Sequence, residues 1–153
     1  MISADYSGFE LGEAERLELS ADYTGSKVGT VGVIDFNANY GKVVVDEAQT
    51  IKGNGDYVTL RFGSISKELV VATDYGSFRV AQLLPEVEKV QIESDYTSIR
   101  LGIAPNWDFQ FEVELDYAGF QSELALEYLK KYKDGSDKYY QGYRLNQNSP
   151  NQL

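Results

Sequence analysis

The sequence predicts an all-β, single-domain parallel β-solenoid of about seven coils, each 17–21 residues long and holding two short strands. An Asp-Tyr or Asn-Tyr dipeptide recurs seven times, at intervals of 17, 17, 17, 18, 21 and 21 residues. Apolar and polar residues alternate between these dipeptides. A hairpin meander would need an Asn-Gly or Asp-Gly at each reversal, and no such dipeptide recurs from repeat to repeat.

The seven dipeptides are expected to stack as a structural ladder along one edge of the solenoid. Parallel stacking places equivalent residues of successive coils about 4.8 Å apart. A single coil buries too little apolar surface to fold alone, so contacts between coils must supply most of the stability. The ladder residues are Asp5, Tyr6, Asp22, Tyr23, Asn39, Tyr40, Asp56, Tyr57, Asp74, Tyr75, Asp95, Tyr96, Asp116 and Tyr117.

Each coil is predicted to contain two half-buried strands. The first strand has apolar residues three and five positions after the tyrosine, such as Leu60 and Phe62, with polar Arg61 between them. This period of two is typical of a strand with one inward face. The second strand leads to the next dipeptide. Its predicted inward residues are Leu17, Leu19, Ile34, Phe36, Leu69, Val71, Val90, Ile92, Phe109 and Phe111.

The same parity, carried through the corner, predicts that the small residue before each acid and the tyrosine itself both point inward. Leu17, Leu19, Ala21 and Tyr23 are spaced by twos. A tyrosine at a corner can bury its ring while its hydroxyl reaches water. We therefore expect the tyrosines to pack in the core, with stacking against a sugar ligand as the alternative. The small-residue column reads Ala4, Ala21, Ala38, Gly55, Thr73, Ser94 and Leu115.

Both ends of the repeat region differ from its middle. Residues 1–122 are assigned to the solenoid and residues 123–153 to an irregular or helical C-terminal cap and tail, in which 123–132 fit either a short helix or a pair of strands. The polar tail 141–151 is expected to be irregular or partly mobile. The chain starts in mid-coil, so we expect a fragment that lacks earlier coils or a signal peptide and that self-associates through its uncapped N-terminal coil.

Composition narrows the function classes. With 42% hydrophobic and 13% aromatic residues in 153, the chain can bury a core and is not disordered. The net charge of −10 argues against nucleic acid as the main partner. Cysteine and histidine are both absent, which removes thiol catalysis, Ser-His-Asp triads and ordinary zinc sites. No signal peptide and no apolar run near twenty residues is visible, so we expect no membrane insertion.

The acidic column of the ladder has two readings. Stacked carboxylates could share calcium ions. Alternatively, each side chain accepts backbone N–H bonds at its own turn, as Asx-turns do. Asn39 fits the second reading, and the glycine-rich nonapeptide of calcium-binding solenoids is missing. We therefore expect a structural role and no metal, cofactor or catalytic residue.

Two further surface features stand out. The basic residues Lys27, Arg61, Arg79 and Arg100 share one outward column. A positive stripe on an acidic protein is one interpretation, and a solvated face that balances Glu and Asp is the default. The two longest coils each insert a proline-containing segment at the same corner, and these insertions should touch. Insertions often form the binding face of a repeat protein, although Trp107 is alternatively a cover for the core. The candidate ligand-binding residues are Leu84, Pro85, Pro105, Asn106 and Trp107.

The repeats also resemble a known family. The runs Ser94-Asp95-Tyr96-Thr97-Ser98-Ile99-Arg100-Leu101-Gly102, Ala38-Asn39-Tyr40-Gly41-Lys42-Val43 and Thr73-Asp74-Tyr75-Gly76-Ser77-Phe78 are similar to the adhesin-like β-solenoid domains of Bacteroidetes-type bacteria, of the auto-transporter adhesin or toast-rack type. The resemblance covers roughly residues 3 to 122. It implies export to the cell surface, outer membrane or periplasm, and no catalytic residue carries over from it.

The expected function is a non-enzymatic cell-surface or periplasmic binding module, an adhesin for a glycan or surface protein. A structural spacer or assembly unit that acts through its exposed coil ends is the alternative. A polysaccharide-active β-helix enzyme is a third, weaker reading, because it would need paired carboxylates in a groove.

Overall fold

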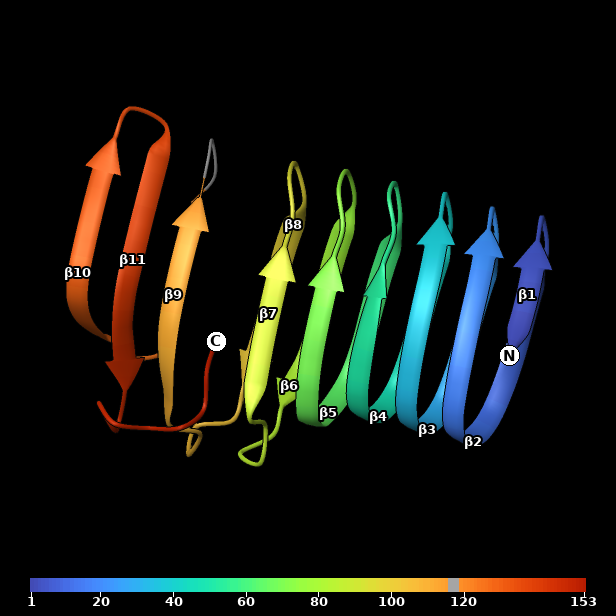
Figure 1. Cartoon of the computed structure of the whole chain (residues 1–153), viewed down its shortest axis with the longest axis horizontal. Coiled ribbons are helices and arrows are strands. Elements are labelled where there is room, and N and C mark those ends of the chain that lie inside the picture. Colours follow the sequence, from blue (N-terminus) through green and yellow to red (C-terminus); the bar gives the residue numbers. More distant parts are fainter. Residues whose placement is uncertain (116–118) are drawn as a thin grey trace.

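The computed structural model describes residues 1–115 and 119–153, so Asp116 and Tyr117 of the predicted ladder lie outside the described residues. The described chain is all-β and forms a parallel β-solenoid of about six turns as a single domain, which confirms the predicted fold (Figure 1). The strands are β1 (Ile2–Asp5), β2 (Gly8–Asp22), β3 (Gly25–Asn39), β4 (Lys42–Asn54), β5 (Thr59–Ala72), β6 (Ser77–Leu83), β7 (Lys89–Glu93), β8 (Ser98–Ile103), β9 (Phe109–Leu115), β10 (Glu127–Asp134) and β11 (Asp137–Arg144).

The register places each repeat directly on the next. Leu17 lies opposite Ile34, Ile34 opposite Ile51, Ile51 opposite Leu69, and Leu69 opposite Val90, all in parallel pairs. In β2 to β5 the two predicted strands merge into one strand of 13 to 15 residues that bends without losing its pairing. In the longer coils the insertions split this strand, so that β5 pairs with β6 on one wall and with β7 on the other.

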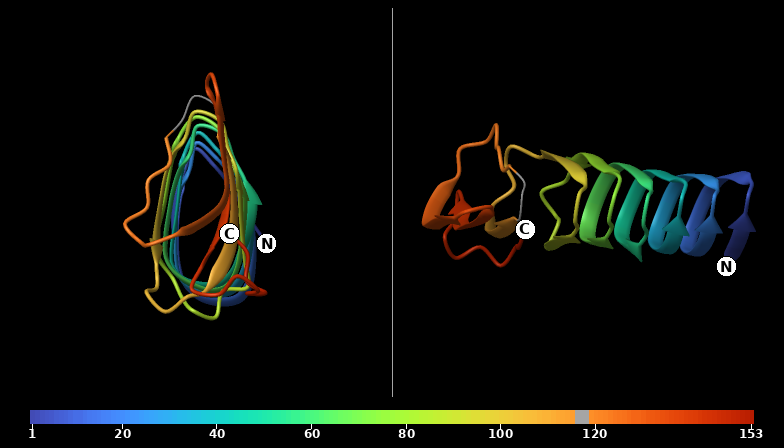
Figure 2. Two further views of the ribbon diagram at one scale, coloured as in Figure 1. Left: turned by 90° about the vertical axis from the view of Figure 1, so that its left-hand side faces the viewer. Right: turned by 90° about the horizontal axis from the view of Figure 1, so that it is seen from above.

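The core fills the narrow interior between the two walls, which Figure 2 shows end-on. The predicted inward positions of the central coils are buried, which confirms the alternation. The small column at the corner also faces inward, with Ala21, Ala38, Gly55 and Thr73 all buried. Each interior side chain packs against its equivalents above and below because the register is in phase.

The tyrosines do not point inward, so that prediction is wrong. Six of them have positive φ angles of 50–55°, in the left-handed region that non-glycine residues seldom adopt. A strand alternates its side chains only while it stays extended. The left-handed residue therefore breaks the parity and turns the ring outward, although its N–H still continues the pairing, as Tyr40 N–H does to Asp56 O at 3.0 Å.

The C-terminal region is a second sheet in place of a last coil. Strand β11 pairs antiparallel with both β10 and β9, so residues 127–134 are strand and not helix. The β10–β11 hairpin turns through Gly135, whose φ of 59° at the first turn position fits a type II′ turn. Because β9 belongs to this sheet, the cap begins before residue 123, the boundary that the sequence predicted.

Of the tail 141–151, residues 145–151 are irregular as predicted, but the end of the chain is bonded to the solenoid. The first residues of the tail, through Arg144, form β11. Farther along, the Gln152 carbonyl accepts from Val90 N–H at 2.7 Å and Gln152 N–H donates to Glu88 O at 3.0 Å. The tail thus pairs with the first residues of β7, at an edge that the solenoid leaves unpaired.

Candidate functional site

The corner with the two proline insertions is closed. The insertions touch, as predicted, because Ala104 N–H donates to Leu83 O at 3.0 Å. Trp107, however, is 0% exposed, and its indole N–H donates to Val87 O at 2.8 Å. Its ring packs on Phe109 with centroids 4.4 Å apart. The indole cannot reach a ligand, so its interpretation as a ligand contact is wrong and Trp107 belongs to the core.

The C-terminal tail contacts this corner at one of the other candidates, Pro105, and at the neighbouring Asp108. The Arg144 guanidinium donates to Pro105 O at 2.6 Å, and the Asn151 amide donates to Asp108 O at 3.0 Å. Leu84 and Pro85 are partly exposed, and Pro105 and Asn106 are exposed. These residues therefore share a corner whose carbonyls anchor the tail. Sequence alone gave no sign of that contact, because the tail carries no repeat.

The tyrosines of the repeat dipeptides within the described residues form an exposed stack, here called the tyrosine ladder. Its members are Tyr6, Tyr23, Tyr40, Tyr57, Tyr75 and Tyr96. Successive ring centroids are 4.8–5.1 Å apart with interplanar angles of 3–7°. Each ring face inside the stack is covered by its neighbours, so a sugar cannot stack there. The ladder leaves ring edges and hydroxyls to solvent, which makes it a stabilising edge.

The ladder should be sensitive to alkaline pH. Partial removal from water raises the pKa of Tyr75 above its ordinary value of 10.0, with further contributions from Tyr57, Tyr96, Asp74 and Asp95. Because the pKa of Tyr75 is raised in the folded state, the stabilisation that its protonated phenol contributes is fully present below about pH 10. That contribution is lost as the pH rises through the pKa of the folded state. We expect the melting temperature to fall above about pH 10, as Tyr75 ionises. Melting temperatures measured at fixed pH values between about pH 7 and pH 9 should be equal. A fall of the melting temperature within that range would contradict tyrosine ionisation as its cause.

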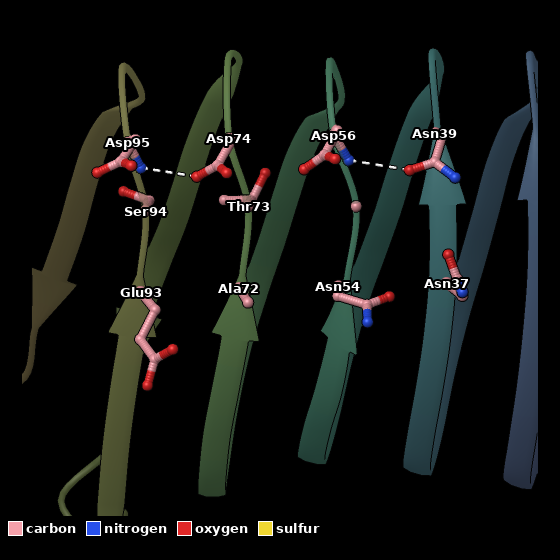
Figure 3. Close-up of a pocket in the computed structure, with 11 residues that line it drawn as sticks. Asn37, Asn39, Asn54, Asp56, Ala72, Thr73, Asp74, Glu93, Ser94 and Asp95 are labelled. Carbon is pink, nitrogen blue, oxygen red and sulfur yellow. Dashed lines mark hydrogen bonds between the residues drawn. The ribbon is translucent and has the colours of Figure 1, made fainter.

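The acidic column beside the ladder links neighbouring coils. Asp56 N–H donates to Asn39 Oδ1 at 3.1 Å and Asp95 N–H donates to Asp74 Oδ1 at 2.8 Å (Figure 3). The Asn39 amide also donates to Asp22 Oδ1 at 3.1 Å. The acceptor role is as predicted for these side chains, but the donors lie in adjacent coils and not at the same turn. In the described part of the chain, no group of three acids is arranged to hold a metal ion.

A shallow polar hollow of about 550 Å³ lies next to this column and follows the coil axis over four coils (Figure 3). It is here called the polar groove. The ends of β3, β4, β5 and β7 and the residues that follow them line it, because parallel register places equivalent positions in one row; most of the lining side chains point outward, while Gly55 and Thr73 belong to the buried small column. Its lining is Asn37, Asn39, Asn54, Gly55, Asp56, Ala72, Thr73, Asp74, Glu93, Ser94 and Asp95.

Several polar groups in the groove have no partner within the described protein. The amides of Asn37 and Asn54 are exposed and make no side-chain hydrogen bond there. The carboxylates of Asp56 and Asp95 are likewise exposed, while Glu93 accepts from the Gln91 amide at 2.9 Å. The groove thus offers amide donors and carboxylate acceptors in rows about 4.8 Å apart. Sequence reasoning missed it, because the second-strand polar column was read only as solvent-facing.

The basic column lies on the opposite wall. Lys27 pairs with Glu10 at 3.0 Å, and that hydrogen bond raises the pKa of the Lys27 ammonium. Arg61, Arg79 and Arg100 follow in register on β5, β6 and β8 and are exposed. Within the described residues, these three arginines form no ion pair. The balancing of basic by acidic residues that the sequence predicted is therefore found for Lys27 only.

The fold defines the chain as a parallel β-solenoid with an antiparallel C-terminal cap. Comparison with protein-family models, curated proteins and solved structures finds no match to this chain. No helix in the described ranges has the length and apolar character needed to cross a membrane.

Proposed function

We propose that this chain is a non-enzymatic binding module, an adhesin-like solenoid whose polar groove holds an extended, hydroxyl-rich ligand such as a neutral glycan. The observation that carries the proposal is the row of unpartnered amides and carboxylates in a hollow that follows the coil axis. Sugar hydroxyls both donate and accept, so they match carboxylate acceptors and amide donors together. Acids in the groove and a net charge of −10 favour an uncharged ligand over an anionic one at this place.

The groove chemistry favours binding over hydrolysis. Glycoside hydrolysis needs one carboxyl group kept protonated, usually by an apolar pocket, beside a second that is ionised. Asp56 and Asp95 are exposed and Asp74 accepts a backbone N–H, in a groove lined mostly by polar residues, so none of the three lies in such an apolar pocket. The proposal includes export to the cell surface or periplasm, in line with the resemblance to adhesin-like solenoid domains.

Binding to an array of neutral and charged glycans and of extracellular-matrix proteins tests this proposal. The variant Asn37→Ala/Asn54→Ala removes two free amides and is expected to weaken binding of a neutral glycan about tenfold, since each lost hydrogen bond contributes about 0.5–1.5 kcal/mol. The matched control is Gln49→Ala/Gln147→Ala, which removes two exposed amides outside the groove.

Saturable binding that the groove variant loses and the control keeps would support the proposal. Equal binding by both variants would place the ligand elsewhere. If the folded protein binds no probe and its molecular mass in solution rises with concentration, the result would favour an assembly unit and contradict the binding module.

A further inference from the structure

The wall opposite the polar groove carries a concentrated positive charge on an acidic protein. Residues 59–65 of β5, together with β6 and β8, contain three arginines and not one Asp or Glu, although the chain as a whole has a net charge of −10. Figure 1 shows β6 and β8 on the far wall, behind β5 and β7. Positive charge is therefore segregated on one wall of these coils.

The register fixes the spacing of the three charges. Arg61 lies opposite Arg79 and Arg79 opposite Arg100 in parallel pairs. The tyrosine rings of the same three coils are stacked at centroid distances of 5.0 and 5.1 Å, which measures the step from coil to coil. Adjacent guanidinium groups with no acidic partner repel one another, so an anion that bridges them relieves that repulsion.

The flanking columns suit an anionic ligand. On one side of the arginines lie the hydroxyls of Thr59, Ser77 and Ser98, which make no side-chain hydrogen bond within the described residues. On the other side lie Gly63, Ala81 and Gly102, whose small size leaves the guanidinium groups open. Guanidinium forks bind carboxylate and sulfate oxygens in pairs, and nearby hydroxyls donate further hydrogen bonds.

We propose that Arg61, Arg79 and Arg100 form a binding face for a linear acidic polysaccharide, with one carboxylate or sulfate group on each guanidinium. A chain that bears one anionic group per sugar ring repeats on nearly the same step as the coils, so three contacts form together and reinforce one another. Nucleic acid fits less well, because its dense phosphates need a broad basic footprint and meet the acidic remainder of this protein.

The test measures binding of the natural chain to polygalacturonate oligosaccharides, dextran sulfate, neutral dextran and single-stranded DNA at about 0.15 M salt, where the screening length is about 8 Å. Under these conditions distant acids are screened while direct pairs persist. We expect saturable binding to at least one acidic polysaccharide that depends on the three arginines. Any binding of neutral dextran belongs to the polar groove and should be unchanged in the arginine variants; the two acidic probes separate carboxylate from sulfate recognition.

Three variants sharpen the test. Arg61→Gln/Arg79→Gln/Arg100→Gln is expected to weaken binding at least about tenfold, equivalent to about 1.4 kcal/mol. Lys67→Gln/Lys89→Gln/Lys133→Gln, which removes the same charge elsewhere, should bind as the natural chain does. Arg61→Lys/Arg79→Lys/Arg100→Lys keeps the charge but loses the forks and should weaken binding about threefold, which is about 0.7 kcal/mol.

Each other result overturns the proposal. If the glutamine and control triples bind equally, the face is not the site. If the lysine triple matches the natural chain, paired guanidinium recognition is wrong. If single-stranded DNA binds and the polysaccharides do not, the partner class is wrong, and absence of binding to every acidic probe removes the face altogether. The substituted side chains lie outside the polar groove, so these outcomes are independent of the neutral-glycan test.

Discussion

Replacing Trp107 with alanine is expected to lower the free energy of unfolding by about 4 kcal/mol, within the range of about 3–5 kcal/mol for buried large aromatic residues. The indole is 0% exposed and packs on Phe109 with centroids 4.4 Å apart. Its removal also leaves Val87 O, the acceptor of its N–H at 2.8 Å, without that partner. The cavity would open where the solenoid meets the cap, so both units lose support.

Denaturant unfolding followed by circular dichroism measures this effect, with the slope compared between variants to detect any change in the unfolding transition. Trp107→Phe is the matched control: it keeps an aromatic ring and loses the hydrogen bond, and should cost less than half as much as alanine. Any loss of ligand binding in the alanine variant would then follow from unfolding. A stable alanine variant with impaired binding would contradict this and return Trp107 to the ligand site.

Replacing Tyr57 with alanine is expected to cost about 2–3 kcal/mol of unfolding free energy, a large effect for a half-exposed residue. The ring stacks on Tyr40 and Tyr75, each at 5.0 Å. Such pairs contribute about 0.5–1.5 kcal/mol apiece beyond the area that they bury. Alanine would lose both contacts and keep the left-handed backbone conformation, whose φ is 55°.

Two comparisons separate the stack from the backbone. Tyr57→Gly should be more stable than Tyr57→Ala by about 0.5–1 kcal/mol, because glycine adopts positive φ without a Cβ clash. Tyr132→Ala removes an exposed tyrosine of β10 outside the ladder and should change stability little. Thermal and denaturant melts of the variants provide the measurement. If Tyr57→Ala were as mild as Tyr132→Ala, the ladder would not stabilise the fold.

The functional proposals follow from the same regularity that builds the fold. Because each coil repeats the chemistry of the previous one, a single polar position becomes a row and a single arginine becomes a column. The polar groove and the arginine face lie on opposite walls of β5 and its neighbours, so the two proposed binding sites do not overlap. Rows of this kind match extended ligands better than compact ones.

The sequence by itself determined the fold class, the register and the inward faces of the walls. Those features follow from the repeat period, which can be read from the sequence directly. An offset of 17 residues keeps Leu17, Ile34 and Ile51 in phase, and parallel stacking in that register buries all three. The sequence also identified outward Arg61, Arg79 and Arg100 correctly as one column. Whether these arginines have acidic partners depends on the residues of the neighbouring columns, which only the tertiary structure places beside them.

Only the tertiary structure decided how the corners and the end of the chain behave. The tyrosine rings point outward because a left-handed residue interrupts the alternation, and their mutual stacking across coils offsets that conformation. Asn39 Oδ1 and Asp74 Oδ1 accept the backbone N–H of Asp56 and Asp95 in the next coil, a contact that exists only once the coils are stacked. Trp107 is buried and the tail is fixed at β7 because aperiodic segments meet there, and contacts between segments far apart in sequence leave no mark in a local pattern.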